Sequence, residues 1–366
     1  MSTSTSETSS EAHMSSEIKP ASWLDTVRRA VDERLTRFFD EERSAVGTLA
    51  PDAAIVLAGL ESLTLRGGKR LRPAMLVAAQ RAIDPRAPLS GVLSACASLE
   101  VLQSYLLIHD DWMDGDDERR GGPAVHVLVR RELGSRGEGV VGAHLADSLA
   151  VLAGDLGCAY ANRLFLESAL GSRRAGEAME TFLRVQRDVV LGQTLDLLGS
   201  ADVSRMHDLK TGSYTVEGPL LLGAILADAS AAQIEALRRI ARPLGEAFQV
   251  RDDLLGSFGD PKKTGKPVGN DLRVGKHNAI VRECEASVPV ADRAPLTKIL
   301  GRADATDADV RTAIAMLETA GVRARVEAKL ASLVEAAKAP LTAAPFSPEG
   351  SRAIGELADL FGARES

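Results

Sequence analysis

The stretch LLIHDDWMDGDDERRGG, residues 106–122, carries an unusual density of charge at the end of an apolar run. Six acids fall within the nine positions 110–118, and two arginines and two glycines follow them at once. Carboxylates crowded this closely repel one another. The sequence therefore predicts that a cation holds this segment together, and the surrounding residues indicate which cation and for what chemistry.

Helical periodicity over residues 89–114 predicts that the first of these acids lie at the end of a helix. At about 100° per residue, Asp110 and Asp114 lie one turn apart on one face. Two carboxylates in this arrangement can chelate a hard divalent cation. An acidic helix end in solvent is the alternative, but the apolar LLI before the acids indicates a buried helix that carries them out of a core.

A second acidic cluster, GEAFQVRDDLLGSFGD at residues 245–260, repeats this design. Asp252 and Asp253 again follow an apolar approach, and Gln249 and Gly256 share their helical face. Mg²⁺ commonly binds one or two carboxylates and completes its shell with water and substrate phosphate. Two such helices facing each other would bind several Mg²⁺ ions around a phosphorylated substrate.

Basic residues accompany both acidic clusters. The segment GGKRLRP, residues 67–73, puts Lys69, Arg70 and Arg72 on a glycine-rich turn entering a helix, where free N–H groups favour an anion. Further cations follow the acids or stand between them: Arg119, Arg120, Lys210, Lys266 and Lys276. Any one alone could be an ordinary surface charge. Their alternation with the acids predicts two diphosphate pockets, one metal-dependent and one metal-free.

The composition and periodicity of the whole chain predict an all-α protein. Hydrophobic residues make up 45% of the 366 residues and aromatics only 4%, a balance that suits packed helices better than strands. We find no convincing strand alternation, repeat or linker, and predict one large helical domain over residues 21–366, after a polar, disordered tail over residues 1–20. Helices are predicted over residues 23–39, 53–65, 73–83, 89–114, 123–134, 141–170, 174–198, 205–214, 218–228, 231–256, 277–286, 306–319 and 321–338.

Charge, cysteines and hydropathy exclude several classes of function. The formal net charge of −7 argues against sequence-independent nucleic-acid binding, which needs a basic surface. Three widely separated cysteines without metal-ligand spacing indicate reduced residues in a cytoplasmic protein. No uninterrupted apolar run approaches the roughly 20 residues that span a bilayer, so we expect no transmembrane segment.

With these motifs in hand, the sequence resembles the trans-polyprenyl diphosphate synthase family, the head-to-tail prenyltransferases. Six matching segments occur in the family's order between residues 67 and 276. They are GGKRLRP (67–73), HDDWMDGDDERRGGPAVH (109–126), LAGD (152–155), GQTLD (192–196), KTGSYTVEGPLLLGA (210–224) and FQVRDDLLGSFGDPKKTGKPVGNDLRVGK (248–276). A lone DDxxD would be weak, but the set is specific.

The resemblance implies the all-α terpenoid-synthase fold, with helices around a deep central cavity, and a homodimer. It assigns the first aspartate-rich motif to Asp110, Asp111 and Asp114 and the second to Asp252 and Asp253. The implied metal ligands, for three Mg²⁺ ions on an allylic diphosphate, are Asp110, Asp111, Asp114 and Asp252. The residues implied to help bind this diphosphate are Arg119, Lys210, Thr211, Lys266 and Lys276, while Gln193 and Gln249 are implied to line the cavity. The residues implied for isopentenyl diphosphate are Lys69, Arg72, Gln103 and Arg120.

The implied reaction explains why acids should crowd together. An allylic diphosphate (dimethylallyl, geranyl or farnesyl) ionises to a carbocation, which alkylates the double bond of isopentenyl diphosphate. Mg²⁺ and cationic side chains stabilise the charge on the departing diphosphate. No side chain looks like a dedicated base, so the departed diphosphate is expected to take the proton that completes elongation.

Three positions depart from the family's pattern. Gly256 stands where many members carry the last aspartate of the second motif, which puts the metal affinity there in question. Gln103 occupies a place that is often histidine and can still donate hydrogen bonds. The bulk of Trp112 within DDWMD has no explanation in the sequence.

Product length is expected to depend on residues four and five positions before the first aspartate, Leu106 and Tyr105. An ideal helix puts Leu106 near the face of Asp110 but rotates Tyr105 by about 140°, so geometry nominates only Leu106 and the resemblance adds Tyr105. A floor about 6–8 Å below the acids predicts a short-chain product. We predict geranylgeranyl diphosphate, with farnesyl diphosphate or a longer product as alternatives.

Two other functions share parts of this pattern. A class I terpene cyclase would carry the fold and the first acids but a different second metal motif, and it would not need Lys69 and Arg72. A non-catalytic partner subunit of a prenyl synthase would usually lose one acidic cluster, and here both are largely present. Turnover by the purified protein alone discriminates between them.

Overall fold

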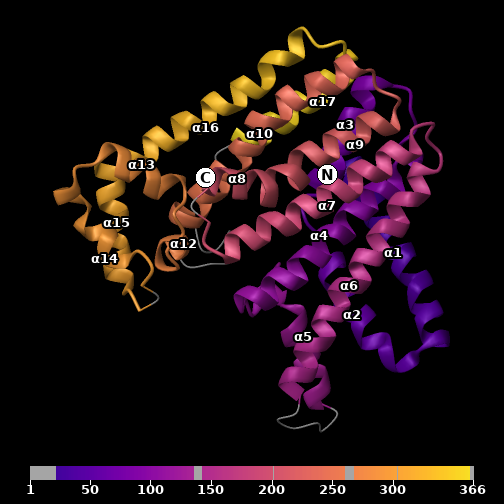
Figure 1. Ribbon diagram of the computed structural model, residues 1–366, viewed down its shortest axis with the longest axis horizontal. Helices are drawn as coiled ribbons and strands as arrows, with labels where there is room; N and C mark the ends of the chain where they lie inside the picture. The colour runs from indigo at the N-terminus through magenta and orange to yellow at the C-terminus, as the bar shows by residue number, and fades with distance from the viewer. Residues whose placement is uncertain (1–21, 136–141, 201, 260–267, 303, 363–366) are drawn as a thin grey trace, which may run out of the picture.

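The computed structural model describes residues 22–135, 142–200, 202–259, 268–302 and 304–362, and within them the chain is almost entirely helical. In Figure 1, α4, α6 and α7 cross the middle of the molecule, while α13, α14 and α15 form a lobe on one side and α1, α2 and α5 lie on the other. The α-helices are α1 (Trp23–Leu49), α2 (Ala54–Leu65), α3 (Leu71–Ile83), α4 (Leu93–Asp114), α5 (Val125–Ser135), α6 (Gly142–Ala169), α7 (Ala175–Leu197), α8 (Val203–His207), α9 (Gly218–Leu226), α10 (Ala231–Phe258), α12 (Asn270–Arg273), α13 (Ala279–Ser287), α14 (Ala294–Ile299), α15 (Asp307–Thr319), α16 (Val322–Lys338) and α17 (Pro348–Gly362).

Shorter elements join these helices. Four short 3₁₀ helices are η1 (Pro51–Ala53), η2 (Leu89–Gly91), η4 (Val290–Arg293) and η5 (Ala339–Thr342), and η3 (Asp208–Glu217) is a π-helix. The strands β1 (Glu118–Arg119) and β2 (Gly122–Pro123) pair antiparallel, with Arg119 opposite Gly122. Two residues are too few to show strand alternation, so this hairpin was not predicted. The all-α fold class is confirmed.

Local sequence determines where several helices begin. Ser230 caps α10 through a reciprocal capping box with Gln233, which satisfies two backbone N–H groups that the first turn leaves free. Asn278 caps α13, and Thr306 caps α15 by accepting from the Asp309 backbone N–H. Such caps typically contribute about 1 kcal/mol each. They fix the starts of the helices that surround the second acidic motif.

The helices α4 and α6 pack closely because small residues let their backbones approach. The His109 ring lies so near Gly154 that a Cβ there would stand 2.1 Å from His109 Nε2. Further along, Ser98 Oγ donates to the Ala161 carbonyl at 2.7 Å. These contacts fix α4, whose last turn carries the first acids.

The helix α6 is apolar enough to need a separate explanation. Its stretch from His144 to Ala169 is long enough to cross a membrane, and its most apolar 18-residue window has a mean hydropathy of 1.2. Burial against α4, α5 and α2 accounts for part of that composition, since 44% of the most apolar window is buried within the fold. A core helix of a globular protein passes the same test of length and hydropathy.

The helix predictions are confirmed along most of the chain, with the following differences. The predicted helices 205–214 and 218–228 are joined by the π-helix η3 into one almost continuous run. The short helices α12 and α14 were not predicted. Nor was α17, although its buried residues Ala353, Ile354, Leu357 and Phe361 follow helical spacing. The predicted tail, residues 1–20, lies outside the described residues.

Candidate active site

The first acids lie in the last turn of α4, which ends at Asp114 with Gly115 as a left-handed cap (φ 69°). The C-terminal end of a helix carries partial negative charge, so acids there are repelled by the backbone as well as by one another. Asp114 is exposed, yet partial desolvation and then Asp110 raise its pKa above the ordinary range. This end of α4 therefore favours a bound cation.

Asp111 is fully buried and faces Arg119 of the hairpin. Arg119 Nε donates to Asp111 Oδ1 at 2.6 Å, and Arg119 Nη2 donates to Asp116 at 3.0 Å. Burial outweighs the arginine and raises the pKa of Asp111. Its Oδ2 atom has no hydrogen-bond partner in the described part of the chain. Asp111 therefore joins the hairpin to α4 and keeps one buried oxygen for a further donor or cation.

Lys210 projects from the π-helix η3 toward the first acids. Its Nζ lies 3.5 Å from Asp110 Oδ1 and also contacts Asp196 of α7. Burial opposes the charge of Lys210, but Asp110 and Asp196 outweigh burial and raise its pKa. Lys210 is therefore a fixed cation beside the end of α4. π-Helical turns are rare and occur frequently at functional sites.

Two glycines let η3 lie close to both α7 and α10. A Cβ on Gly192 of α7 would stand only 2.3 Å from the backbone nitrogen of Lys210. A Cβ on Gly245 of α10 would lie 3.4 Å from Gly212 Cα. The position of Lys210 thus depends on the absence of a side chain on α7.

Asp252 and Asp253 lie near the end of α10 and have different surroundings. Gln249 Nε2 donates to Asp253 Oδ1 at 2.8 Å, and the Ala279 backbone N–H donates to Asp253 Oδ2 at 2.8 Å. Both oxygens of this buried acid are therefore engaged within the protein. Asp252 has accessible surface, but the protein around it disfavours its charge, and this desolvation together with Asp253 raises the pKa of Asp252 to about 7. Asp252 is the acid of the pair that a cation can reach.

The two motifs flank one segment of the chain. η3 packs against both α7 and α10, and His207 precedes it directly. Desolvation lowers the pKa of His207, while Asp253 from the second motif and Asp196 from α7 act in the opposite direction. Asp110 of the first motif and Asp253 of the second therefore both lie near the segment from His207 to Lys210.

The donor set fits Mg²⁺ when an anion supplies further oxygens. Asp110, Asp114 and Asp252 offer carboxylate oxygens, the ligands that Mg²⁺ prefers, and Asp111 keeps its Oδ2 atom without a hydrogen-bond partner among the described residues. No group of three Asp, Glu, His or Cys side chains in the described ranges is close enough to bind a metal by itself. Mg²⁺ completes its shell with water and substrate phosphate, so this open arrangement suits it.

Arg72 and Arg120 form a basic cluster, and Arg72 lies near enough to Asp252 to oppose the rise in its pKa. The Arg72 guanidinium donates to Thr215 Oγ1 at 2.9 Å and stacks 4.3 Å above the Tyr214 ring, while its Nε has no partner among the described residues. Arg120 adopts a left-handed backbone (φ 53°) and donates to the Leu63 carbonyl at 3.3 Å. Burial, with Arg70 and Arg72 nearby, lowers the pKa of Arg120 although Glu100 opposes this. Unneutralised positive charge of this kind favours a bound anion.

Arg70, one of the cations of the predicted basic turn, forms ion pairs within the fold. Arg70 is buried, donates through Nε to Asp32 at 2.9 Å, and pairs with buried Glu100. Arg66 was not singled out from the sequence, yet its Nη1 donates to the carbonyls of Arg119 and Pro123 at 3.0 and 2.7 Å. These two arginines hold the turn and the hairpin that carry the anion-binding candidates.

A cavity of about 230 Å³ opens between α4 and α7 next to Asp110. Tyr105 and Leu106 both line it, so the cavity is wider than the ideal-helix argument for Leu106 alone assumed. Tyr105 stacks edge-on against His109, with ring centroids 5.1 Å apart, and packs beside Gly157. The other lining residues are Leu107, His109, Asp110, Met113, Val189, Val190, Gln193, Thr194, Leu197, Lys210 and Tyr214.

The remaining predicted residues are placed as follows. Lys69 is exposed on the turn before α3, and Gln103 is half-buried two turns before Asp110 on α4. Thr211 is half-buried in η3. Lys276 is exposed, with Nζ 3.4 Å from Asp271 Oδ1. Lys266 lies outside the described residues.

Sequence reasoning missed several side chains at the site. Asp196 contacts Lys210, and Tyr214 and Thr215 hold Arg72. Asp196 belongs to the segment GQTLD, and Tyr214 and Thr215 belong to KTGSYT. Both segments match the family, so the sequence could have indicated these three residues.

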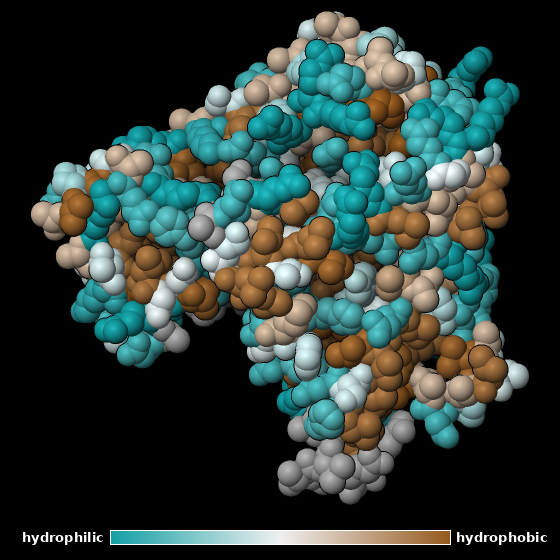
Figure 2. Space-filling view, viewed as in Figure 1, coloured by the Kyte–Doolittle hydropathy of each residue, from teal (hydrophilic) through white to brown (hydrophobic). Residues whose placement is uncertain are grey.

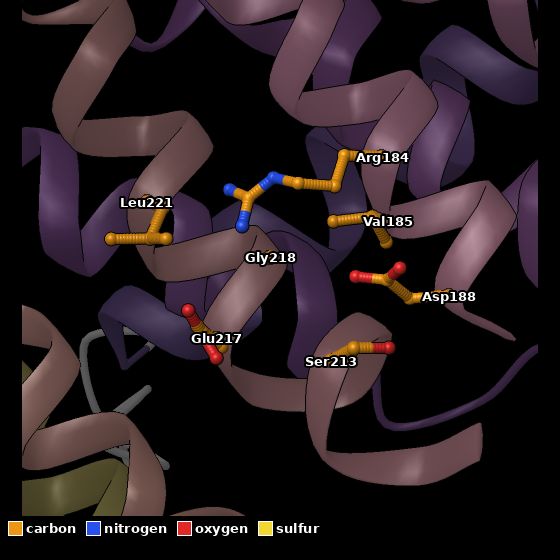
Figure 3. A pocket seen from close by; sticks show the side chains of 7 residues that line it. All are labelled: Arg184, Val185, Asp188, Ser213, Glu217, Gly218 and Leu221. Atoms are coloured by element: carbon orange, nitrogen blue, oxygen red, sulfur yellow. The ribbon is translucent and has the colours of Figure 1, made fainter. Parts of the chain in front are cut away.

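A second, smaller cavity of about 20 Å³ lies between α7, η3 and α9, room for about one water molecule. Figure 3 shows Arg184, Asp188, Ser213 and Glu217 around it. None of the acids of either motif lines it. It adds no chemistry to the site on α4 and α10.

Known proteins match the chain over most of its length. The model of the polyprenyl synthetase family matches residues 54–317. The chain is 34% identical over 263 residues to the short chain isoprenyl diphosphate synthase of Methanocaldococcus jannaschii, which covers 70% of this chain and 74% of that protein. It is 32% identical over 301 residues to the geranylfarnesyl diphosphate synthase of Aeropyrum pernix, covering 80% of this chain and 88% of that one.

Solved structures agree. The fold superposes with a TM-score of 0.84 on the geranylgeranyl pyrophosphate synthase of Corynebacterium glutamicum, a complex with isoprenyl diphosphate and magnesium. That match has 30% sequence identity and covers 93% of this chain and 99% of the other. With two acidic helix ends, a basic pocket and an apolar cavity in one arrangement, the chain belongs to the polyprenyl synthetase family.

Proposed function

We propose that this enzyme is an Mg²⁺-dependent trans-prenyltransferase that condenses isopentenyl diphosphate with an allylic diphosphate. The observation that carries the proposal is the separation of charge at the site. Acids stand at the ends of α4 and α10, while Arg72 of α3 and Arg120 of the hairpin form a basic cluster next to Asp252. Two diphosphates, one bound through metal and one directly, account for both regions.

In the allylic half, Asp110, Asp114 and Asp252 would hold Mg²⁺ against the diphosphate. When bound, Mg²⁺ neutralises charge that develops on the departing diphosphate, which lowers the barrier to C–O cleavage. Lys210 adds a fixed positive charge because Asp110 and Asp196 keep it protonated and oriented. Asp111, held by Arg119, orients the last turn of α4.

In the other half, Arg72 and Arg120 would bind the diphosphate of isopentenyl diphosphate, with Lys69 and Gln103 at its edge. Tyr214 and Thr215 fix the Arg72 guanidinium before substrate arrives, which reduces the ordering cost on binding. The apolar cavity receives the growing chain and excludes water, which would otherwise quench the carbocation.

We further propose geranylgeranyl diphosphate as the product. Tyr105 and Leu106 line the cavity just below Asp110, and side chains of this size leave limited room for a chain. The similarity to a geranylgeranyl pyrophosphate synthase over nearly the whole chain supports this length. The fact that Tyr105 packs directly on α6 at Gly157 supports its part in the floor.

A homodimer in the cytoplasm completes the proposal. Apolar side chains gather on the exposed faces of α6 and α7, as the brown areas over these helices in Figure 2 show. Outside the cavity, the exposed residues are Leu145, Leu152 and Leu166 on α6, Leu183 and Leu191 on α7, and Leu170 and Leu198 directly after these helices. Exposed apolar side chains gathered in this way indicate a protein interface, and a second copy would cover them symmetrically. Three free cysteines suit a reducing compartment.

The test is incubation of the purified enzyme with isopentenyl diphosphate, each allylic primer and Mg²⁺, with mass analysis of the dephosphorylated alcohols. We expect a C20 alcohol that disappears when EDTA removes the metal. A C15 or C25 alcohol would keep the reaction and change the product. A cyclic hydrocarbon would support a cyclase, and no product from any primer would support a non-catalytic partner subunit.

A further inference from the structure

The two acidic motifs differ at one equivalent position. On α4, Asp114 follows Asp110 by four residues, so two carboxylates stand one turn apart. On α10, the residue four positions after Asp252 is Gly256, which has no side chain. Taken from its own helix alone, the second motif offers a cation one carboxylate fewer than the first.

A carboxylate from another element occupies the space at this position. A Cβ on Gly256 would stand 2.0 Å from Asp271 Oδ2 and 2.6 Å from Asp271 Cγ, so the Asp271 carboxylate lies directly on the Gly256 backbone. Any side chain at position 256 would have to displace it. The absence of a side chain at position 256 therefore leaves the space that the Asp271 carboxylate occupies.

The structure holds Asp271 firmly in this place. It lies in α12 beside Leu272, which is fully buried in the core. Gly269 starts this helix in a left-handed turn (φ 70°) and packs so tightly that a Cβ would lie 2.6 Å from Val310 of α15. Arg273 pairs with Asp307 on the far side. The side chain of Asp271 is only 15% exposed, and its Oδ1 lies 3.4 Å from Lys276 Nζ.

We propose that Asp271 supplies, from α12, the acid that α10 lacks at position 256, and so completes the metal-binding face formed by Asp252. This inference rests on the proposed function. Gly256 is then an adaptation that makes room for Asp271, and the second motif is assembled from two helices. Its affinity for Mg²⁺ depends on Asp271 as well as on Asp252.

The test measures binding of Mg²⁺ in the presence of inorganic pyrophosphate by calorimetry, without any turnover. Asp271→Ala should weaken Mg²⁺ binding by about tenfold, the lower end of what partner residues of metal sites contribute. Gly256→Ala removes no charge but displaces the carboxylate, and should weaken binding in the same direction. The exchange variant Gly256→Asp with Asp271→Ala returns the acid to α10 and should recover most of the affinity.

Controls separate this inference from its alternatives. Asp292→Asn removes an exposed acid from η4 and should leave Mg²⁺ binding unchanged. Lys276→Met should weaken pyrophosphate binding without Mg²⁺, whereas Asp271→Ala should not. Unchanged Mg²⁺ affinity in Asp271→Ala, or an exchange variant as weak as Asp271→Ala, would overturn the inference while leaving the proposed function standing. A wild type that binds no Mg²⁺ with pyrophosphate would overturn both.

Discussion

The C-terminal ends of α4 and α10 both carry two adjacent acids, but the buried acid of each pair has different hydrogen-bond partners. Each carries a reachable acid, Asp110 or Asp252, and next to it a buried one. On α4 the buried acid, Asp111, is balanced by a full charge from Arg119. On α10 the donors to the buried acid, Asp253, within the described ranges are neutral, the Gln249 amide and the Ala279 backbone N–H. A repeated sequence pattern therefore does not imply a repeated electrostatic environment.

This difference has a structural consequence. The pair of Asp111 and Arg119 ties α4 to a hairpin, whereas Asp253 ties α10 to the first turn of α13. Each buried acid thus anchors a different neighbour, and each reachable acid is left for substrate. We therefore expect substitutions at the two helix ends to have similar effects on kcat and different effects on the free energy of unfolding.

The largest effect is expected from the reachable acids. Asp110→Asn and Asp252→Asn each remove a carboxylate that we propose holds Mg²⁺, and each should lower kcat by about 10²–10³-fold. Single-turnover assays with saturating substrates measure this, and Asp292→Asn serves as the matched control. A large loss at one end only would break the equivalence of the two motifs.

The buried acids should separate the two ends by stability. Asp111→Asn replaces the charged partner of Arg119 Nε with a neutral amide, while Asp116 still accepts from Arg119 Nη2, and should lower the free energy of unfolding by roughly 2–3 kcal/mol. Asp253→Asn keeps an oxygen for the Ala279 N–H, and should cost about 1–2 kcal/mol. Urea unfolding of the metal-free variants gives both values. Equal losses would show that the arginine adds nothing over neutral donors.

Protonation should sharpen the comparison at α10. Because desolvation and Asp253 raise the pKa of Asp252 to about 7, Asp252 is neutral below pH 7 and must lose a proton before it binds a cation. Mg²⁺ affinity should therefore rise by up to about tenfold per pH unit below pH 7 and level off above it. Calorimetry of wild type and Asp252→Asn isolates this contribution from the titration of pyrophosphate. A pH dependence that is identical in both proteins would contradict it.

Substitutions of the residues that line the cavity below Asp110 should change the rate least, but they should change the length of the product. Leu106→Ala and Tyr105→Ala enlarge the cavity below Asp110 and should lengthen the product by one isoprene unit, with kcat/KM changed by less than about tenfold. Met113→Ala lies in the same cavity on the other side of Asp110 and should leave the length unchanged. Mass analysis of the alcohols decides, and an unaltered product in both floor variants would place the floor elsewhere.

Much of this site could be predicted from sequence because its signals are local. Asp110 and Asp114 stand one turn apart on a periodic helix, and the apolar approach to Asp252 has the same form. Helical spacing also predicted most of the bundle. What local spacing could not show is which of two adjacent acids faces inward, since Asp111 and Asp253 are buried by contacts with Arg119 and α13.

Long-range contacts account for the rest. Arg70 stands in a basic turn, yet Asp32 and Glu100 draw it into the core. The π-helix η3 has no distinct period in ten residues, so it was predicted as the end of an ordinary helix. The helix α17 was not predicted, although its apolar spacing was sufficient to predict it.

The close packing of η3 against α7 limits which residues the protein can accept at position 192. Gly192 touches no substrate in the proposed mechanism, yet even a single methyl group there would collide with the Lys210 backbone at 2.3 Å. Natural selection should therefore purge alanine at this position about as strongly as it purges a lost aspartate. In a screen of random variants, substitutions of Gly192 should therefore appear among the inactive clones. They would lose activity because they displace the neighbouring η3, since Gly192 itself takes no part in the reaction.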